Sequence, residues 1–370
     1  MEVERDMAGL TLPFAAGVAT VMLFSGTFCA RPHLYSTLSY GFILLSLSFL
    51  LHPCHTSFSP RQLRIAAGMS LACCGILCGM SGEILSVGTM HGGGLLPVTE
   101  GLGTAMGERI DSLPFASPDT NAIIKALIIG DKSDIPPHII SAFRKSGASH
   151  ILALSGLHLG IIYGIMVKTS SLLGNSAPAR IVRSSAIVLT CGIYTLAVGA
   201  GPSIVRAFIF ILLGETARLT GRYRSTGTIL MAALMIHLVI APRSFREVGF
   251  QLSYAAMAGL AFIFPWLRRF WPETTALKRQ QPIRKVWETA AMSISCQITT
   301  GPLAYMYFGT FPTHFLLTNL IAIPLTGLII PIALAVLCLS AMGICPDMLS
   351  RAAEALVTAL SEALEIISSM

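Results

Sequence analysis

The chain has 370 residues, of which 54% are hydrophobic and only 12% are charged, and its formal net charge is +7. Soluble domains carry about 25% charged residues, so this composition excludes an ordinary water-soluble globular protein. It predicts an all-α integral membrane protein whose helices cross the bilayer many times. The positive charge excludes nothing by itself, because cytoplasmic loops are basic in any membrane protein.

Apolar runs that could cross a bilayer recur along the whole chain. A hydrocarbon core about 30 Å thick needs roughly 20 residues of helix. The runs lie at 10–28, 34–51, 63–90, 148–167, 184–200, 203–217, 226–241, 248–267, 286–308 and 315–343. They predict a polytopic transmembrane bundle of about ten spans. The last run contains Pro324 and Pro331 and is too long for one straight span.

Basic residues gather in alternate loops. The groups are Arg61 and Arg64; Lys168, Arg180 and Arg183; Arg218, Arg222 and Arg224; and Arg268, Arg269, Lys278, Arg279, Arg284 and Lys285. Counting spans puts all four groups on one side, which the positive-inside rule identifies as the cytoplasm. Arg31 and the Arg243/Arg246 pair are the exceptions on the outer side. We therefore expect a multi-pass protein of the bacterial cytoplasmic membrane with a cytoplasmic, uncleaved N-terminus.

Three regions follow from this pattern: N-terminal spans in 1–96, a more polar extracytoplasmic stretch in 97–147, and a second transmembrane region in 148–370. In 97–147 we expect two amphipathic helices, one from about Asp119 to Gly130 and one from Asp134 to Gly147. Both are too polar to span the membrane, so they form either a surface linker or a lid.

The tail, 351–370, places Leu356, Leu360, Leu364 and Ile367 opposite three glutamates. This spacing predicts an amphipathic helix that lies in the interface or lines an aqueous cavity. The nine cysteines and the His52-Pro-Cys-His55 cluster match no standard zinc spacing, so we expect no metal, no cofactor and no disulfide framework.

Polar residues within apolar runs need a reason, because each costs roughly 2.5–3.5 kcal/mol at the bilayer centre when it is charged. The densest cluster is 149–160, with His150, Ser155, Gly156 and His158. On a helix Ser155 and His158 would lie near one face, and Gly156 with Gly160 would form a small-xxx-small contact. These side chains either line a path or simply hydrogen-bond neighbouring helices.

Two more clusters are candidates for a path or binding site. Arg206 follows the helix-breaking run 199–203 and is either a cavity-lining cation, a partner of Glu215, or a side chain that snorkels to the interface. Gln251, Ser253 and Tyr254 place hydrogen-bonding groups in an apolar stretch, where they line a path or hold helices together.

Several blocks together resemble one family. They are Gly130-Asp131; Phe143, Gly147 and Ser149 to His158; Ser203 with Arg206-Ala207; Gly221-Arg222; Pro242 with Gly249 to Tyr254; and Thr318 to Leu325. This combination, over about 120–345, is similar to the transmembrane domain of the ComEC-type DNA-internalisation proteins of bacterial competence.

The resemblance implies a channel component that passes single-stranded transforming DNA across the cytoplasmic membrane. It implies single-stranded DNA and membrane lipid as partners, together with DNA-uptake machinery, a separate nuclease and further copies of the chain. Arg206 and the basic loops would attract the phosphates, and Tyr163, Tyr194 and Tyr254 are candidates for base stacking. Full-length members usually carry an OB-like and a nuclease domain, whose sequence signs are missing here, so we expect no enzyme activity.

Two other classes stay open. One is a transporter of another small or lipid-like solute. The other is an intramembrane serine hydrolase with Ser155 as nucleophile and His158 as base. The hydrolase is disfavoured, because residues three apart on one helix rarely point their functional atoms at each other and the nearest acid is Glu215.

Overall fold

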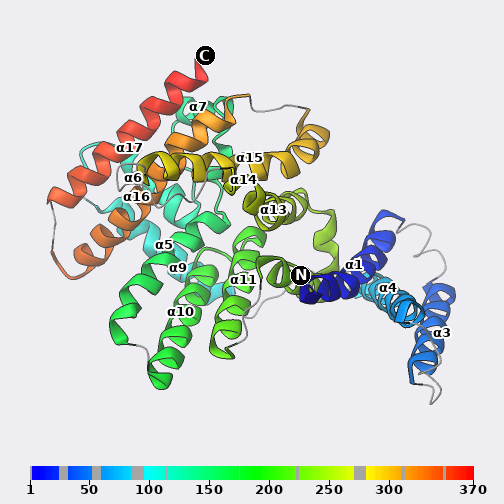
Figure 1. Ribbon diagram of the computed structural model, residues 1–370. Coiled ribbons are helices and arrows are strands. Elements are labelled where there is room, and N and C mark those ends of the chain that lie inside the picture. The colour runs from blue at the N-terminus through cyan, green and yellow to red at the C-terminus, as the bar shows by residue number, and fades with distance from the viewer. Residues whose placement is uncertain are drawn as a thin grey trace. The chain divides into compact units, whose positions relative to one another are not determined.

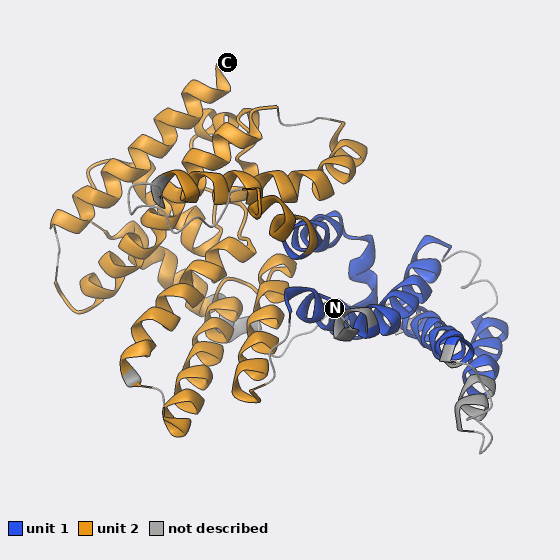
Figure 2. Cartoon of the chain, in the orientation of Figure 1, with its two compact units in different colours: residues 1–92, 223–261 blue, residues 93–222, 262–370 orange. Residues whose placement is uncertain are grey.

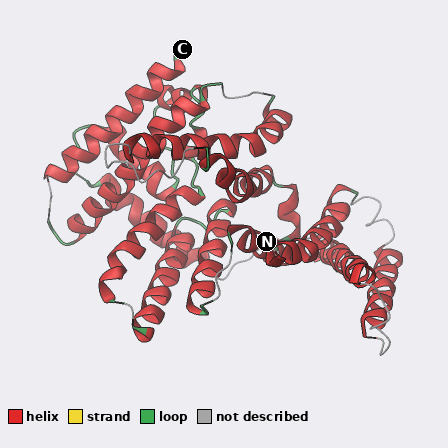
Figure 3. Ribbon diagram, viewed as in Figure 1, coloured by secondary structure: helices red, strands yellow, loops and turns green. Residues whose placement is uncertain are grey.

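The computed structural model describes residues 2–24, 32–51, 60–85, 96–113, 115–174, 176–221, 225–270, 281–309, 313–344 and 347–370. Every regular element in these residues is a helix, which confirms the all-α prediction (Figures 1 and 3). The chain divides into two compact units, unit 1 (1–92 and 223–261) and unit 2 (93–222 and 262–370) (Figure 2).

Unit 1 is built from α1 (Glu2–Leu23), α3 (Pro32–Leu51), α4 (Pro60–Leu85), α12 (Thr226–Ile240), the 3₁₀ helix η3 (Pro242–Arg246) and α13 (Val248–Ala258). Helices α1 and α4 cross with their backbones in contact. A Cβ atom on Gly17 would overlap the carbonyl oxygen of Ala72, and one on Gly75 would overlap that of Phe14. Small residues let membrane helices approach in this way.

Ion pairs at one end of unit 1 explain the two basic residues on the predicted outer side. Glu83 at the end of α4 lies 3.2 Å from Arg243 and 3.1 Å from Arg246. Arg246 also donates to the carbonyl of Met22 at the end of α1. These two arginines therefore neutralise an acid and hold helix ends together, which is a local reason for an exception to the loop-charge pattern.

Unit 2 contains the remaining helices. They are α5 (Leu96–Asp111), α6 (Pro118–Ile129), α7 (Pro137–Lys145), α8 (Ser149–Leu152), α9 (Gly156–Ser170), the 3₁₀ turn η2 (Ser171–Leu173), α10 (Ala177–Ala197), α11 (Pro202–Leu219), α14 (Phe264–Arg268), α15 (Gln281–Phe308), α16 (Phe315–Ala341) and α17 (Asp347–Ser368). A π-helical segment, Gly259–Ile263, joins α13 to α14.

The main core of unit 2 forms where α6 packs against α16 and α17. The two amphipathic helices end where predicted, since Gly130 and Gly147 both adopt the left-handed conformation that stops a helix. However, most of α6 is buried within unit 2. Ile124, Ala126 and Leu127 are fully buried, because apolar residues occupy most of its circumference. Helix α5 was not predicted.

The tail helix α17 matches the amphipathic pattern read from the sequence. Its apolar face, which includes Val357, Leu360, Leu364 and Ile367, is buried. This face packs against α16, α7 and α6. The apolar stripe of α17 therefore forms part of a protein core. The sequence predicted a helix in the interface or along an aqueous cavity, so packing in a core is a third arrangement.

Among the residues that the structure describes, five helical segments are long and apolar enough to cross a membrane, whereas the apolar runs of the whole sequence predict about ten. They are Asp6–Leu23, Arg64–Glu83, Ala177–Ala197, Val248–Arg268 and Phe315–Ala341. Other runs are helical but fall short for physical reasons. Helices α9 and α12 have 15 residues each, which is about 22 Å. Helix α11 carries three charged side chains.

The long run at the end of the chain is a single helix. Helix α16 continues through Pro324 and Pro331 for 27 residues. A helix of that length measures about 40 Å, so it must tilt in a bilayer of ordinary thickness.

Candidate functional site

The block Ser149 to His158 is a broken helix rather than a continuous one. Helix α8 ends at Leu152, Ala153 and Ser155 are extended, and α9 begins at Gly156. Ser155 is therefore the N-cap of α9 and lies outside the helix. The predicted span that begins at 148 is thus interrupted within its first turns.

Ser155 and His158 contact each other through this cap. The Ser155 N–H donates to His158 Nδ1 at 3.2 Å, and the Ser155 Oγ lies 3.1 Å from the same nitrogen. The Leu157 N–H donates to Ser155 Oγ. His158 is 1% exposed. Because Nδ1 accepts the backbone N–H, the proton of the neutral ring belongs on Nε2.

The other members of this block have separate positions. His150 is exposed, and its Nδ1 lies 3.1 Å from the Gly147 carbonyl oxygen. Gly156 approaches α11, since a Cβ there would lie 3.4 Å from the Cβ of Ala207. Nothing lies within 4 Å of such an atom on Gly160. Only the first glycine of the small-xxx-small pair therefore serves a helix contact.

Arg206 lies in the first part of α11, behind an irregular turn. The turn includes Gly199 and Ala200, and Ala200 adopts φ 49°, which is strained for a residue with a side chain. Arg206 is 1% exposed, and its Nη2 donates to Ser203 Oγ at 2.9 Å. No side chain caps the N-terminus of α11. A buried cation thus lies near the positive end of a helix, where an anion is favoured.

The contacts of the Glu215 carboxylate are made with residues other than Arg206. Its Oε1 accepts from Tyr163 at 2.8 Å and lies 2.9 Å from Arg218, and its Oε2 accepts from Ser184 at 2.7 Å. Glu215 is 1% exposed, so its charge is buried but fully hydrogen-bonded.

This network, which we call the Glu215 junction (Tyr163, Ser184, Glu215 and Arg218), joins α9, α10 and α11 and was missed from the sequence. The signal that could have found it is the i, i+3 spacing of Glu215 and Arg218 on one helix face. Because Glu215 serves this junction, it does not orient His158 for catalysis.

The third polar cluster belongs to unit 1 and holds helices together. Gln251 donates to the Phe245 carbonyl at 2.9 Å, and the Tyr254 hydroxyl donates to the Ala233 carbonyl at 3.1 Å. The Phe250 ring lies 5.0 Å from that of His237, edge to face. Ser253 is half-buried on the same helix. The predicted site residues are therefore divided between the two units.

The tyrosines suggested for base stacking are occupied otherwise. Tyr194 and Tyr254 are buried, and the Tyr194 hydroxyl donates to the Ile128 carbonyl at the end of α6. Tyr163 belongs to the Glu215 junction. In this structure neither buried ring is open to a nucleobase.

The Gly130-Asp131 block is part of a charged cluster in the 97–147 stretch. Lys125 Nζ lies 2.8 Å from Asp111, 2.8 Å from Asp134 and 3.6 Å from Asp131. The hydrogen bond to Asp111, followed by that to Asp134, raises the pKa of Lys125. The Ser133 N–H donates to Asp131 and lowers the pKa of its carboxyl, with a smaller contribution from Lys125. This Lys125 staple ties α5, α6 and the following turn together.

Metal chemistry finds no support in the part of the chain that the structure describes. Its His, Cys, Asp and Glu side chains form no group that could hold a metal ion. The six described cysteines are free thiols. The His52–His55 cluster lies outside the described residues.

Comparison with known proteins identifies the family to which residues 127–370 are similar. A family model described as "Competence protein" matches residues 127–370. The chain is 28% identical over 217 residues to ComE operon protein 3 of Bacillus subtilis, which covers 58% of this chain and 25% of the relative. It is 27% identical over 222 residues to competence protein ComA of Neisseria gonorrhoeae, covering 58% of this chain and 30% of that protein.

A third relative is YcaI of Escherichia coli, whose printed name calls it an uncharacterized protein. The chain is 26% identical to it over 226 residues, which cover 58% of this chain and 28% of YcaI. The chain thus spans less than a third of each of these relatives. No solved structure matches. The match covers every block on which the resemblance was based, and the chain belongs to the competence protein family.

Proposed function

We propose that this chain is a channel component that passes single-stranded transforming DNA across the bacterial cytoplasmic membrane. It would be a multi-pass protein with a cytoplasmic N-terminus. Membership of the competence family supports a role in DNA uptake, and the five apolar helical segments support a position in the membrane.

The burial of the Arg206 cation is the observation that supports the proposal most directly. A polyanion that crosses a low-dielectric slab needs cations along a polar path. Arg206 supplies a buried cation beside the N-terminus of α11, and backbone N–H groups at such an end also favour phosphate. Both follow the turn at 199–201 in the chain, and its residues Gly199 and Ala200 are exposed. A phosphate that entered at this turn would meet the two positive elements together.

The Ser155 block lies next to this position. The start of α9 packs on α11 through Gly156 and Ala207, and Ala207 directly follows Arg206. The break at 153–155 also leaves the start of a helix within the apolar run. Interrupted helices are tolerated at membrane depth where they line protein or water. The two blocks therefore support one common region of unit 2 as the path.

The test is transformation of a competent host that lacks this gene and carries wild-type, Arg206→Ala or Arg206→Lys copies. We expect DNA to reach a nuclease-protected state outside the cytoplasmic membrane in every strain. Entry into the cytoplasm should fall with Arg206→Ala and recover partly with Arg206→Lys. Membrane fractionation checks that each variant is inserted. Normal transformation in the deletion strain would favour a transporter of another solute instead.

Orientation is tested separately. Single cysteines at positions 275 and 311, in a chain without its native cysteines, should react with membrane-impermeant reagents from opposite sides. Position 275 should be labelled only from the cytoplasm, because its loop is basic. Labelling of both positions from one side would overturn the proposed topology without bearing on the cargo.

A further inference from the structure

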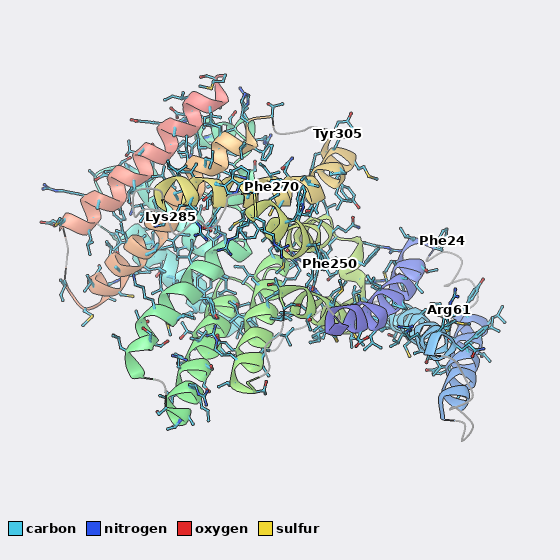
Figure 4. All side chains as sticks on the ribbon, viewed as in Figure 1. Phe24, Arg61, Phe250, Phe270, Lys285 and Tyr305 are labelled. Atoms are coloured by element: carbon cyan, nitrogen blue, oxygen red, sulfur yellow. The ribbon has the colours of Figure 1, made fainter. Side chains whose placement is uncertain are left out.

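The ends of α14 and α15 expose basic and apolar side chains together. We call the exposed side chains of 266–270 and 283–286 the basic–aromatic strip. Figure 4 labels Phe270 and Lys285, which come from its two segments. The two helices pack against each other, and the strip continues from the end of the candidate span Val248–Arg268. It thus begins where a crossing helix would leave the hydrocarbon.

Ion pairs hold one arginine of each helix in place. Glu288 lies 3.2 Å from Arg268 of α14 and 3.2 Å from Arg284 of its own helix. One carboxylate therefore serves two arginines. Arg269 and Lys285 are also exposed beside them. Four bases against this one acid leave the described strip with an excess of positive charge.

The apolar side chains of the strip are exposed. Trp266 is 58% exposed and Phe270 is 62% exposed, and their rings meet edge to face with centroids 4.8 Å apart. On α15, Ile283 and Val286 are 54% and 56% exposed on either side of the two bases Arg284 and Lys285. Aromatic rings and aliphatic side chains are thus exposed beside the cations.

From this combination we infer that the basic–aromatic strip binds the headgroups of anionic phospholipids. Tryptophan is enriched at the level of lipid headgroups, and basic side chains next to a span attract anionic lipids. Charge complementarity selects an anion. The exposed Ile283 and Val286 favour lipid over single-stranded nucleic acid, because aliphatic side chains gain by insertion among acyl chains, whereas a base would stack only on the rings of Trp266 and Phe270. This inference does not depend on the proposed passage of DNA.

The experiment uses the full chain in nanodiscs that contain equal amounts of phosphatidylglycerol and phosphatidylcholine. Native mass spectrometry of the released protein then counts the lipids of each kind that stay bound. We expect phosphatidylglycerol to be enriched. The double variant Arg269→Gln/Lys285→Gln should lower its affinity about 30-fold, given the attraction of each base to an anionic surface. This variant leaves the Glu288 ion pairs intact.

The matched control is Arg144→Gln/Lys145→Gln, which removes the same charge from two exposed residues at the end of α7. It should keep the enrichment. Equal loss in both variants, or no loss in the first, would overturn the inference. A second readout is quenching of Trp266 by brominated phosphatidylglycerol, in a chain in which Trp271 and Trp287 are phenylalanine.

Competition distinguishes the other ligands. If the strip binds lipid, millimolar inorganic phosphate and a single-stranded oligonucleotide should leave the Trp266 quenching unchanged. Displacement by inorganic phosphate would identify a free-anion site and overturn the lipid assignment. Displacement by the oligonucleotide, lost in the double variant but kept in the control, would identify the strip as a nucleic-acid surface instead.

Discussion

Helices α1 and α4 in unit 1 and helices α9, α10 and α11 in unit 2 are held together by different means. In unit 1 the backbones themselves meet, because Gly17 and Gly75 have no side chain to keep them apart. In unit 2 the helices meet through an apolar cluster that includes Leu159, Ile187 and Ile204, and also through the polar side chains of the Glu215 junction. The first arrangement depends on small size, and the second adds buried hydrogen bonds to apolar packing. A substitution that adds volume should therefore damage unit 1 most, and one that removes a polar group should damage unit 2.

The family match covers only some of the helices of unit 1. It covers residues 127–370 and therefore includes α12 and α13 of unit 1, but not α1, α3 or α4. The candidate cation Arg206 and the broken helix at Ser155 both belong to unit 2. We therefore expect unit 2 to carry the proposed path, while α1, α3 and α4 stabilise unit 1.

The largest effect should come from Gly75→Ala. The new methyl group would overlap the Phe14 carbonyl, which is backbone and cannot rotate away, so α1 and α4 must separate. We expect a loss of about 3 kcal/mol or more, at the upper end of overpacking effects. Hydrogen exchange should rise in α1 and α4 but not in α6. Gly9→Ala in α1 is the control, since no atom lies within 4 Å of the added group. Equal exchange in the two variants would contradict backbone contact.

Glu215→Leu should be next. It removes the acceptor from the Tyr163 and Ser184 hydroxyls, and a loss of about 2–3 kcal/mol is expected for these buried bonds. Combining it with Tyr163→Phe should cost less than the sum of the single changes, because both act on one bond. Thermal unfolding in detergent measures all three variants. Strict additivity would show that the junction does not act as a unit.

Lys125→Met should cost about 1–2 kcal/mol, because the three aspartates that it contacts are partly exposed. Methionine keeps much of the aliphatic stem while removing the ammonium group. Hydrogen exchange at the α5–α6 connection measures the effect, and Lys132→Met, an exposed neighbour, is the control. Unchanged exchange at this connection would exclude the staple.

The pH dependence of this staple follows from its two shifted groups. The lowered pKa of Asp131 means that its stabilisation is present above the ordinary carboxyl pKa and is lost as the pH falls through the lowered value. The raised pKa of Lys125 means that its contribution is present below the ordinary lysine pKa and is lost only as the pH rises through the raised value. Exchange at the connection should therefore show no staple-dependent change between about pH 5 and pH 9.

The smallest effect should come from Ser155→Ala, at about 1 kcal/mol for a lost helix cap. Because Ser155 has this structural role, a fluorophosphonate probe for nucleophilic serines should not label the wild-type protein. Labelling that disappears in Ser155→Ala but persists in Ser149→Ala would revive the hydrolase hypothesis. Ser155 and His158 contact each other although they are three residues apart, because Ser155 is the extended N-cap residue before α9 and not part of the helix.

The sequence by itself determined the helical class, the ends of α6 and α7 and the family blocks. These depend on local chemistry: apolar runs, glycines that stop helices, and residues at fixed spacing. Tertiary structure decided which polar residues pair, since the partners of Glu215 come from three helices and those of Lys125 from segments on both sides of α6. It also decided that α6 is buried. A stripe of apolar residues predicts that something covers it, but whether lipid or protein does so depends on contacts with α16 and α17, far along the chain.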